Sequence, residues 1–281
     1  MIRQVGVLYH PKRADAYAVA CQAVDLLSSQ GLGSALLSAW EDEQIAAALP
    51  DWQLVITCGG DGTILRTTRL AASAGVPQLG VNLGRLGFLA ELQPSELAER
   101  LPAYLDGKCW IEERAMLRAT LVTVADAGRR DEHVERVFDA LNEVLVTRGA
   151  LPRTICVGVK INGVVYNKFS GDGVMVATAT GSTAYSLSAG GPVLTPDQRN
   201  MVLTPLCPHV ARATPLVLPP QTEVTLELSA SYPSILSIDG QVDLALLDGD
   251  VVHVRLSPNV ARFLRARSPG YFYELIGRVL R

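Results

Sequence analysis

The chain has 281 residues, of which 48% are hydrophobic and only 19% are charged, and this composition is typical of a globular protein rather than a disordered one. The formal charge of −3 gives no electrostatic basis for binding nucleic acid. No apolar run reaches the roughly 18 residues that a membrane-spanning helix needs, so a membrane partner is not expected either.

The five cysteines are spread along the chain, are odd in number and form no C-x-x-C pair. This pattern argues against a disulfide framework and against a structural zinc site. The N-terminus lacks the apolar segment and the small-residue cleavage site of a signal peptide. We therefore expect a cytoplasmic protein with reduced thiols.

Strand and helix signals alternate in the N-terminal part of the chain. The continuous apolar run Leu54-Val55-Ile56 indicates a strand buried on both faces of a parallel sheet. Alternation of this kind predicts an open α/β sheet with right-handed crossovers. The expected strands are 5–8, 35–37, 54–56 and 78–82, and the expected helices are 16–27, 41–49, 64–74 and 94–105.

The pattern changes near Cys109 to short β-type runs separated by turns. Asn162-Gly163 is a strong hairpin signal, and Asp239-Gly240 and Asp248-Gly249 are weaker turn signals. We predict an α/β domain over 1–108, a mainly β domain over 109–258, and a C-terminal helix within 259–281 that packs back on the first domain. The expected strands are 117–124, 142–147, 154–161, 164–169, 174–177, 224–228 and 251–256, with one helix at 183–188 and another from 272 to 280.

A glycine-rich turn, Gly59-Gly60-Asp61-Gly62-Thr63, lies between an expected buried strand and the helix that follows it. In open α/β sheets, ligands bind beyond the carboxyl ends of the strands. Glycines let backbone N–H groups approach a phosphate, and the helix N-terminus adds partial positive charge. Thr63 can cap the helix or contact an anion, and Arg66 and Arg69 can neutralise phosphate charge. The turn therefore predicts a phosphate site.

Asp61 is unexpected in an anion-binding turn because its carboxylate repels a phosphate. It fits better as a general base for an attacking hydroxyl, or as a carboxylate near a phosphate-bound metal. The alternative without chemistry is a tight strand-to-helix turn in which Asp61 is the N-cap. The pentapeptide alone leaves these alternatives open.

Several common catalytic motifs are missing from the sequence. The turn lacks the lysine and the length of a Walker A motif and is not G-x-G-x-x-G, which disfavours a standard P-loop or Rossmann dehydrogenase. Neither H-E-x-x-H nor G-x-S-x-G occurs, and the four histidines are scattered. We expect no metal site built from protein ligands alone.

Three further stretches follow the pentapeptide, at 80–89, 141–144 and 170–192. The pentapeptide by itself resembles the GGDGT signature that NAD kinases share with diacylglycerol and sphingosine kinases, and it is close to the GGDGS of phosphofructokinases. All four stretches together resemble those of bacterial NAD kinases in order and spacing over nearly the whole chain.

This resemblance implies a two-domain fold, with an open parallel sheet in an N-terminal α/β domain, an all-β C-terminal domain, and an active site between them. It implies an enzyme that moves a phosphoryl group from ATP or polyphosphate to the 2′-hydroxyl of the adenosine ribose of NAD, making NADP. Mg²⁺ or another divalent cation would arrive with the phosphoryl donor rather than in a protein cage. The resemblance also suggests a homodimer or homotetramer.

The resemblance assigns roles to individual residues. Asp61 would deprotonate or orient the ribose hydroxyl. Asn142 and Glu143 would contact the adenosine, since an amide beside a carboxylate can bind both a base edge and ribose hydroxyls. The other residues that it places in substrate or nucleotide binding are Gly59, Gly60, Gly62, Thr63, Arg66, Phe88, Arg153, Asp172, Thr180, Thr183, Ala184, Tyr185, Ser188 and Gln241.

Within that set, Thr183, Ala184, Tyr185 and Ser188 would line the adenine pocket, and Phe88 would cover the adenine ring. Each assignment has a structural alternative. Tyr185 and Phe88 can be ordinary core aromatics.

Asp172 would hold the nicotinamide side and Gln241 a further part of the ligand. For Gln241 the structural alternative is that Asp239-Gly240, which precedes it, is only a hairpin turn. The sequence leaves these alternatives open.

One position departs from the family pattern. Ser170 stands where many members carry arginine, and neither Arg153 nor Lys168 can be shown from the sequence to replace it. The preference between NAD and NADH therefore stays open, as do the phosphoryl donor, the oligomeric state and any regulation. Two other functions remain as alternatives, namely a lipid kinase built on the same turn and a non-catalytic NAD(P)-binding sensor.

Overall fold

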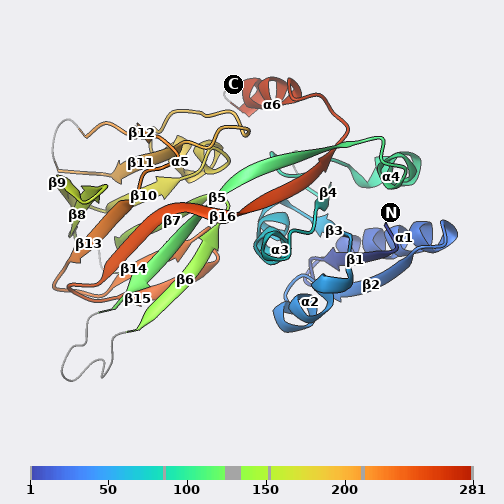
Figure 1. Ribbon diagram of the computed structural model, residues 1–281, viewed down its shortest axis with the longest axis horizontal. Helices are drawn as coiled ribbons and strands as arrows, with labels where there is room; N and C mark the ends of the chain where they lie inside the picture. The colour runs from blue at the N-terminus through green and yellow to red at the C-terminus, as the bar shows by residue number, and fades with distance from the viewer. Residues whose placement is uncertain (1, 85–86, 124–133, 151–152, 210–212, 280–281) are drawn as a thin grey trace. The chain divides into compact units, whose positions relative to one another are not determined.

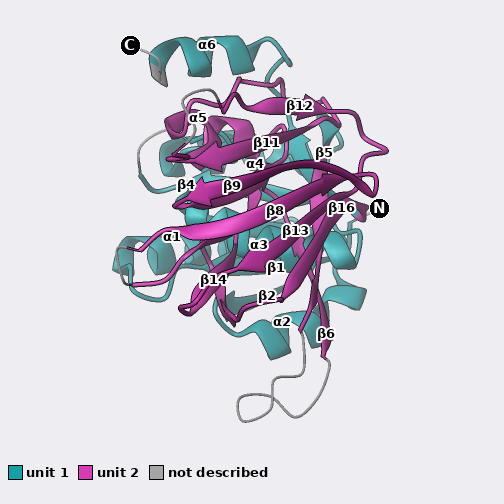
Figure 2. Ribbon diagram, turned by 90° about the vertical axis from the view of Figure 1, so that its left-hand side faces the viewer, with its two compact units in different colours: residues 1–113, 259–281 teal, residues 114–258 magenta. Residues whose placement is uncertain are grey.

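The computed structural model describes residues 2–84, 87–123, 134–150, 153–209 and 213–279. The chain divides into two compact units, with residues 1–113 and 259–281 in unit 1 and residues 114–258 in unit 2 (Figure 2). It leaves unit 1 within strand β5 (Trp110–Val122) and returns within strand β16 (Val251–Arg265). Among the described residues, no helix combines the length and apolar character that crossing a membrane requires.

Unit 1 is built on a parallel sheet with the strand order β2-β1-β3-β4 (Figure 1). All six residues of β3 are buried, as the apolar run predicted. The order changes direction between β1 and β3, and such a switch point leaves a crevice at the carboxyl ends of the strands where ligands bind. The strands are β1 (Gln4–Tyr9), β2 (Gly33–Ser38), β3 (Leu54–Gly59) and β4 (Gln78–Asn82), and the last part of β16 pairs with β4.

Helices cover both faces of this sheet. Val5 and Val7 of β1 belong to an apolar cluster with residues of α1 and α4, whereas Leu8 belongs to a cluster with residues of α2 and α3. Because successive side chains of a strand point to opposite faces, α1 and α4 cover one face and α2 and α3 cover the other. The helices of unit 1 are α1 (Ala14–Ser29), α2 (Asp42–Ala48), α3 (Asp61–Ser73), α4 (Leu97–Leu105) and α6 (Tyr271–Val279), with short 3₁₀ turns at Leu49–Asp51 and Pro94–Glu96.

A buried polar network attaches α3 to the sheet. The Nε2 of Gln78 on β4 donates to the hydroxyl of Thr57 on β3 at 2.8 Å and to the hydroxyl of Thr67 on α3 at 2.6 Å. Thr68 on α3 donates to the Oε1 of Gln78 at 2.8 Å. All four side chains are buried, so these hydrogen bonds are made away from water and fix the position of the helix strongly. The first turn of α3 is thereby held at the carboxyl end of β3.

Glu91 ties the C-terminal segment to the rest of unit 1. Its buried carboxylate accepts hydrogen bonds from the hydroxyl of Tyr104 at 2.9 Å and from the backbone N–H groups of Ala266 at 3.0 Å and Arg267 at 3.2 Å. The guanidinium of Arg265 also lies 3.4 Å from it. Residues that are distant in sequence therefore meet at one buried charge.

Unit 2 consists almost entirely of strands, as predicted. One of its sheets contains β16-β13-β8-β9 in that order, with β5 beside β16 and β6 beside β5, and the other has six strands in the order β12-β11-β10-β7-β14-β15. Val157 of β8 and Val176 of β10 belong to the same core cluster, so the sheets pack face to face as a sandwich. The remaining bounds are β6 (Glu135–Ala140), β7 (Glu143–Arg148), β8 (Ile155–Ile161), β9 (Val164–Gly171), β10 (Gly173–Ala177), β11 (Met201–Leu206), β12 (Leu216–Leu218), β13 (Val224–Ser229), β14 (Ser234–Ile238) and β15 (Val242–Leu246), with a 3₁₀ turn η3 (Gly181–Thr183) and helix α5 (Tyr185–Ser188).

Two tight hairpins have the predicted turn chemistry. Asn162 and Gly163, between β8 and β9, have φ values of 50° and 79°. Asp239 and Gly240, between β14 and β15, have φ values of 54° and 61°. Positive φ at both central residues is the geometry of a type I′ turn, which Asn-Gly and Asp-Gly pairs adopt most readily.

The predicted fold class is confirmed, but several element bounds differ. Strand β5 begins well before residue 117, and strand β16 continues well past residue 256. The charges in these extensions are paired, with Arg262 3.0 Å from Glu113 and Arg265 2.8 Å from Glu112. The sequence did not predict strands β6, β11, β12, β14 and β15. Of the predicted features, Arg85, Leu86, Val124 and Leu280 lie outside the described residues.

Candidate functional site

The glycine-rich turn joins β3 to α3 in unit 1. A Cβ atom on Gly59 would lie 2.6 Å from the Cβ of Thr63, so glycine is needed for the helix to start this close to the strand. Gly60 and Gly62 are different, because no described heavy atom lies within 4 Å of the place where their Cβ would stand. The Cβ positions of both residues thus face open space, at the positive end of the α3 dipole, where a phosphate is stabilised. The side chain of Thr63 is buried.

Asp61 is held in place by the segment that follows β4. It is the first residue of α3 and Gly60 is the N-cap, so the interpretation of Asp61 as the N-cap is wrong. The Asp61 Oδ2 accepts a hydrogen bond from the backbone N–H of Phe88 at 2.8 Å. A Cβ on Gly87 would lie 2.1 Å from the Asp61 Oδ1, so the absence of a side chain at Gly87 makes room for the carboxylate.

Two other predicted ligand residues of unit 1 have protein partners. The ring of Phe88 is half-buried and lies 6.1 Å from the ring of Phe272 on α6. The Nη2 of Arg66 donates to both carboxylate oxygens of Asp42, at 2.7 and 2.8 Å, and the guanidinium carbon of Arg66 lies 5.2 Å from the centre of the Trp40 ring. The phosphate role of Arg66 therefore stays a prediction.

In unit 2, Asn142 and Glu143 stand at the start of β7, beside the ends of β10 and β14. A single buried carboxylate organises this corner. Asp239 accepts the backbone N–H groups of Leu141 at 2.9 Å, Asn142 at 2.7 Å and Glu143 at 3.0 Å. Three hydrogen bonds to one carboxylate fix the backbone that carries the predicted adenosine ligands.

The long glycine-rich stretch packs against the same corner. The backbone N–H of Thr178 donates to the carbonyl of Asn142 at 2.9 Å, and its hydroxyl accepts the backbone N–H of Gly181 at 3.0 Å. A Cβ on Gly181 would lie only 2.0 Å from the carbonyl oxygen of Asn142, which explains the glycine. The fold thus brings together two stretches that are separate motifs in the sequence.

Two polar atoms in this corner are buried without a hydrogen-bond partner among the described residues, namely Oε2 of Glu143 and Oγ1 of Thr180. Buried polar groups in proteins are nearly always hydrogen-bonded, so both atoms have hydrogen-bonding capacity that the described residues do not use. Burial raises the pKa of Glu143 to about 7, with a further contribution from the negative charge of Asp239. When it is protonated, the carboxyl group of Glu143 can donate as well as accept a hydrogen bond.

The raised pKa of Glu143 predicts a pH-dependent stability. The folded chain binds this proton more tightly than the unfolded chain, whose Glu titrates near 4.5, so the stabilisation from the proton is full below pH 4.5 and is lost as pH rises through 7. The side chain is only 8% exposed, and the difference corresponds to about 3 kcal/mol. Urea unfolding from pH 4.5 to 8 should show a decline that Glu143→Gln removes, and parallel curves for the two proteins would contradict the assignment.

The residues predicted to line an adenine pocket occupy η3 and α5. Thr183 and Ala184 are half-buried, whereas Tyr185 and Ser188 are exposed. Tyr185 is 47% exposed, so the alternative that it is a core aromatic is wrong. An exposed ring beside the Asn142 corner remains available to a ligand.

Asp172 and Arg153 do not join this corner within the chain. Asp172 precedes β10 whereas Glu143 pairs with its last residue, so the five residues of β10, about 16 Å of strand, separate them. The Nε of Arg148 donates to Asp172 at 2.7 Å. Arg153 lies over the ring of Tyr232, 4.2 Å from its centre, and donates to its hydroxyl.

Sequence reasoning missed the roles of Asp239, Gly87 and Arg148. Asp239 was noticed only as part of a turn, and Gln241, which was predicted as a ligand, follows it by two residues. The only local signal was the Asp-Gly pair, which requires positive φ but says nothing of partners almost a hundred residues away.

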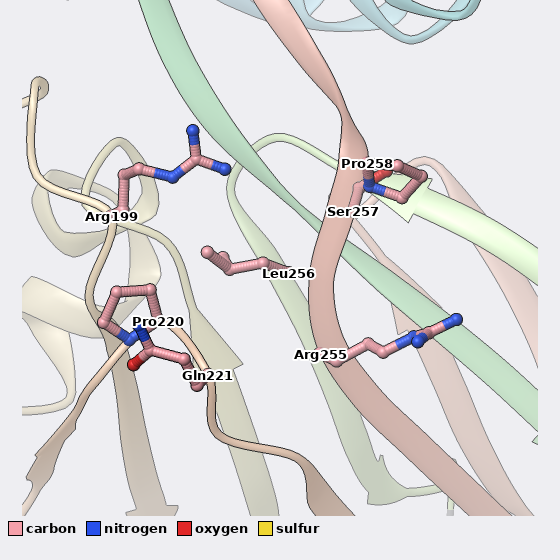
Figure 3. A pocket seen from close by; sticks show the side chains of 7 residues that line it. All are labelled: Arg199, Pro220, Gln221, Arg255, Leu256, Ser257 and Pro258. Atoms are coloured by element: carbon pink, nitrogen blue, oxygen red, sulfur yellow. The ribbon is translucent and has the colours of Figure 1, made fainter.

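A separate cavity of about 540 Å³ lies in unit 2, outside the predicted site. Figure 3 shows Leu256 of β16 pointing toward Arg199, which precedes β11, and toward Pro220 and Gln221, which follow β12. None of the residues that line this cavity was predicted as a ligand residue. They are Arg199, Pro220, Gln221, Arg255, Leu256, Ser257 and Pro258.

Within the part of the chain that the structure describes, no three His, Cys, Asp or Glu side chains are grouped so as to hold a metal ion. A cation with several phosphate and water ligands needs only one or two protein carboxylates. The carboxylate of Asp61, within the glycine-rich turn, is compatible with a cation of that kind.

Comparisons with known proteins cover nearly the whole chain. The family model of the ATP-NAD kinase N-terminal domain matches residues 5–109, and that of the ATP-NAD kinase C-terminal domain matches residues 141–266. An NAD kinase of Dehalococcoides mccartyi is 38% identical over 274 residues, covering 98% of this chain and 94% of the relative. An NAD kinase of Chloroflexus aurantiacus is 36% identical over 282 residues, covering 100% of both.

Solved structures show the same fold. The yeast NADH kinase complexed with NADH superposes with a TM-score of 0.86 at 24% identity, covering 99% of this chain and 87% of that one. An NAD kinase from Archaeoglobus fulgidus in complex with ATP superposes with a TM-score of 0.77 at 24% identity, covering 98% of both chains.

Proposed function

The chain belongs to the NAD kinase family, and we propose that it transfers a phosphoryl group from ATP or polyphosphate to the 2′-hydroxyl of the adenosine ribose of NAD, with Asp61 as the general base. The family membership makes the chain a kinase that phosphorylates NAD. The observation that supports the finer proposal best is the carboxylate of Asp61, oriented by Phe88 at the edge of a phosphate-binding turn.

In phosphoryl transfer the protein mainly positions the reactants and stabilises the negative charge of the transferred group. The ribose hydroxyl gives its proton to Asp61 as its oxygen forms a bond to the terminal phosphorus of the donor. The bond from that phosphorus to the bridging oxygen breaks, and the shortened donor leaves with the electron pair. The backbone N–H groups of the α3 N-terminus bind the phosphate oxygens, on which negative charge is spread during the transfer.

The Asn142 corner supports recognition of the adenosine portion. Glu143 and Thr180 each bury a polar atom that has no partner among the described residues, and ribose hydroxyls or a base edge supply such partners. Because Asp239 holds the backbone of Asn142 and Glu143, that backbone is ordered before the ligand binds, which lowers the entropic cost of binding. Tyr185 adds an exposed ring for stacking on adenine.

A divalent cation, Mg²⁺ by preference, would be bound by the phosphates of the donor and by Asp61 at most. Such an ion neutralises charge on the transferred phosphoryl group. Phosphate oxygens, not the protein, would supply most of the ligands.

One assay tests the proposal. The purified chain is incubated with NAD, Mg²⁺ and either ATP or polyphosphate, and NADP is measured with an NADP-specific dehydrogenase. NADP formation is expected with at least one donor. If neither donor yields NADP while NAD still binds, the chain is the non-catalytic sensor. The family match leaves no support for the lipid kinase.

A further inference from the structure

We propose that His10 and Trp40 form a stacking surface, the His10–Trp40 platform, for the base of a nucleoside triphosphate that serves as phosphoryl donor. The inference rests on the proposed function, because it names the donor of that same site. Neither residue figured in the predicted site, and both follow strands at the edge of the sheet where Asp61 lies.

The platform stands beside the phosphate turn in unit 1. The backbone N–H of His10 donates to the carbonyl of Cys58 at 3.2 Å, one residue before the glycine-rich turn. The backbone N–H of Ala39 donates to the carbonyl of Tyr9, the last residue of β1, at 2.9 Å, which places Trp40 just beyond the end of β2. Neighbouring strands are about 4.8 Å apart, so Trp40 lies two strands, or about 10 Å, from the turn.

The switch point of the sheet lies along this path. The order β2-β1-β3-β4 changes direction between β1, which His10 follows, and β3, which the glycine-rich turn follows. Ligands of open α/β sheets bind in the crevice at such a point. The triphosphate and ribose of a nucleotide span a distance comparable to two strand spacings. A donor whose terminal phosphate is bound at Gly60 therefore brings its base to His10 and Trp40.

The two rings are held in position but remain accessible. Their centroids are 4.7 Å apart with the planes inclined by 58°, and the Nδ1 of His10 accepts the backbone N–H of Lys12 at 3.2 Å. Arg66 lies over the Trp40 ring and is itself fixed by Asp42. Even so, Trp40 is 44% exposed. A large apolar ring that is oriented by its neighbours and still half open to solvent suits a planar base.

The platform gives a physical basis for choosing between donors. Stacking is possible only for a donor that carries a base, so polyphosphate gains nothing from Trp40. A purine offers a larger face than a pyrimidine. The platform therefore favours ATP over both CTP and an inorganic polyphosphate, which is a choice that the sequence left open.

Calorimetric titration of the full chain with Mg-ATP, Mg-CTP and Mg-tripolyphosphate tests the platform. Trp40→Ala should weaken ATP binding about 5- to 100-fold, the range of base–aromatic stacking. It should leave tripolyphosphate within about twofold of wild type and bring the ATP and CTP affinities close together. Tyr166→Ala, which removes an equally exposed ring from β9 of unit 2, should change none of the three affinities.

The proposal is wrong if Trp40→Ala leaves ATP binding unchanged, or if it weakens the binding of ATP and of tripolyphosphate equally. It is also wrong if the wild-type chain binds ATP no better than tripolyphosphate. If Trp40→Ala does not fold, two other variants can be tested by the same titrations, after thermal melting has shown that they fold. These variants are His10→Ala and Trp40→Phe. His10→Ala should weaken ATP selectively, and Trp40→Phe should retain most of the affinity. If the titrations give the expected affinities but the chain forms no NADP, the proposed function is contradicted and the platform is not.

Discussion

Replacing Asp61 by alanine is expected to lower kcat about 10²- to 10⁴-fold, the usual contribution of a positioned general base. The dissociation constant for NAD should stay within about threefold, because the predicted adenosine ligands are other residues. Asp61→Asn sharpens the test, since the amide oxygen can still accept the N–H of Phe88 but the side chain cannot take a proton. NADP formation measures kcat, and calorimetry measures NAD binding.

A matched control for this prediction is Asp106→Asn. Asp106 lies at the C-terminal end of α4, where its exposed carboxylate is near Lys108. It should leave kcat and NAD binding unchanged. If Asp61→Asn keeps kcat within threefold of wild type, Asp61 orients the site through its hydrogen bond and is not the base.

Replacing Asp239 by alanine is expected to lower the free energy of unfolding of unit 2 by about 3–5 kcal/mol, because three backbone N–H groups lose the carboxylate that they bind. The pKa of Glu143 should fall toward its ordinary value, since one of the two causes of its rise is the charge of Asp239. NAD binding should weaken as the Asn142 corner loses its fixed backbone. Urea unfolding followed by circular dichroism measures the first effect.

Asp243→Ala is the control, because Asp243 is exposed on neighbouring β15 and accepts a hydrogen bond from Ser237 at 2.6 Å. Its loss should cost less than about 1 kcal/mol, as surface changes usually do. Equal destabilisation by the two substitutions would show that the three backbone hydrogen bonds of Asp239 carry little energy.

Sequence patterns predicted the α/β unit well because its strands are short apolar runs and its helices have regular apolar spacing. Leu54-Val55-Ile56 form the buried first half of β3, and the alternation of elements implied the parallel sheet. The β unit was predicted less completely. Strands β14 and β15 carry serine and aspartate among their apolar residues, which weakens the strand signal in the sequence. The hydrogen-bond partner of such a side chain can lie on another strand, as Asp243 of β15 does for Ser237 of β14.

The candidate site was predictable where chemistry is local. Asp61 stood out because a carboxylate is unexpected in a phosphate-binding turn, whatever the fold. Asp239 did not stand out, because its importance depends on Leu141, Asn142 and Glu143 approaching it from a distant part of the chain. The need for glycine at position 87 likewise depends on the nearby carboxylate of Asp61, which the local sequence does not reveal.

Unit 1 is discontinuous in sequence, and this has a consequence for synthesis on the ribosome. Ala266 and Arg267, which donate to the buried Glu91, are translated only after the whole of unit 2. Until they emerge, Glu91 lacks these two backbone donors, and a carboxylate with incomplete hydrogen bonding disfavours closure of the core around it. Unit 2 is a contiguous segment, 114–258, so its folding does not depend on residues that are translated later. Unit 2 can therefore complete its fold before unit 1 does, although the synthesis of unit 1 begins first.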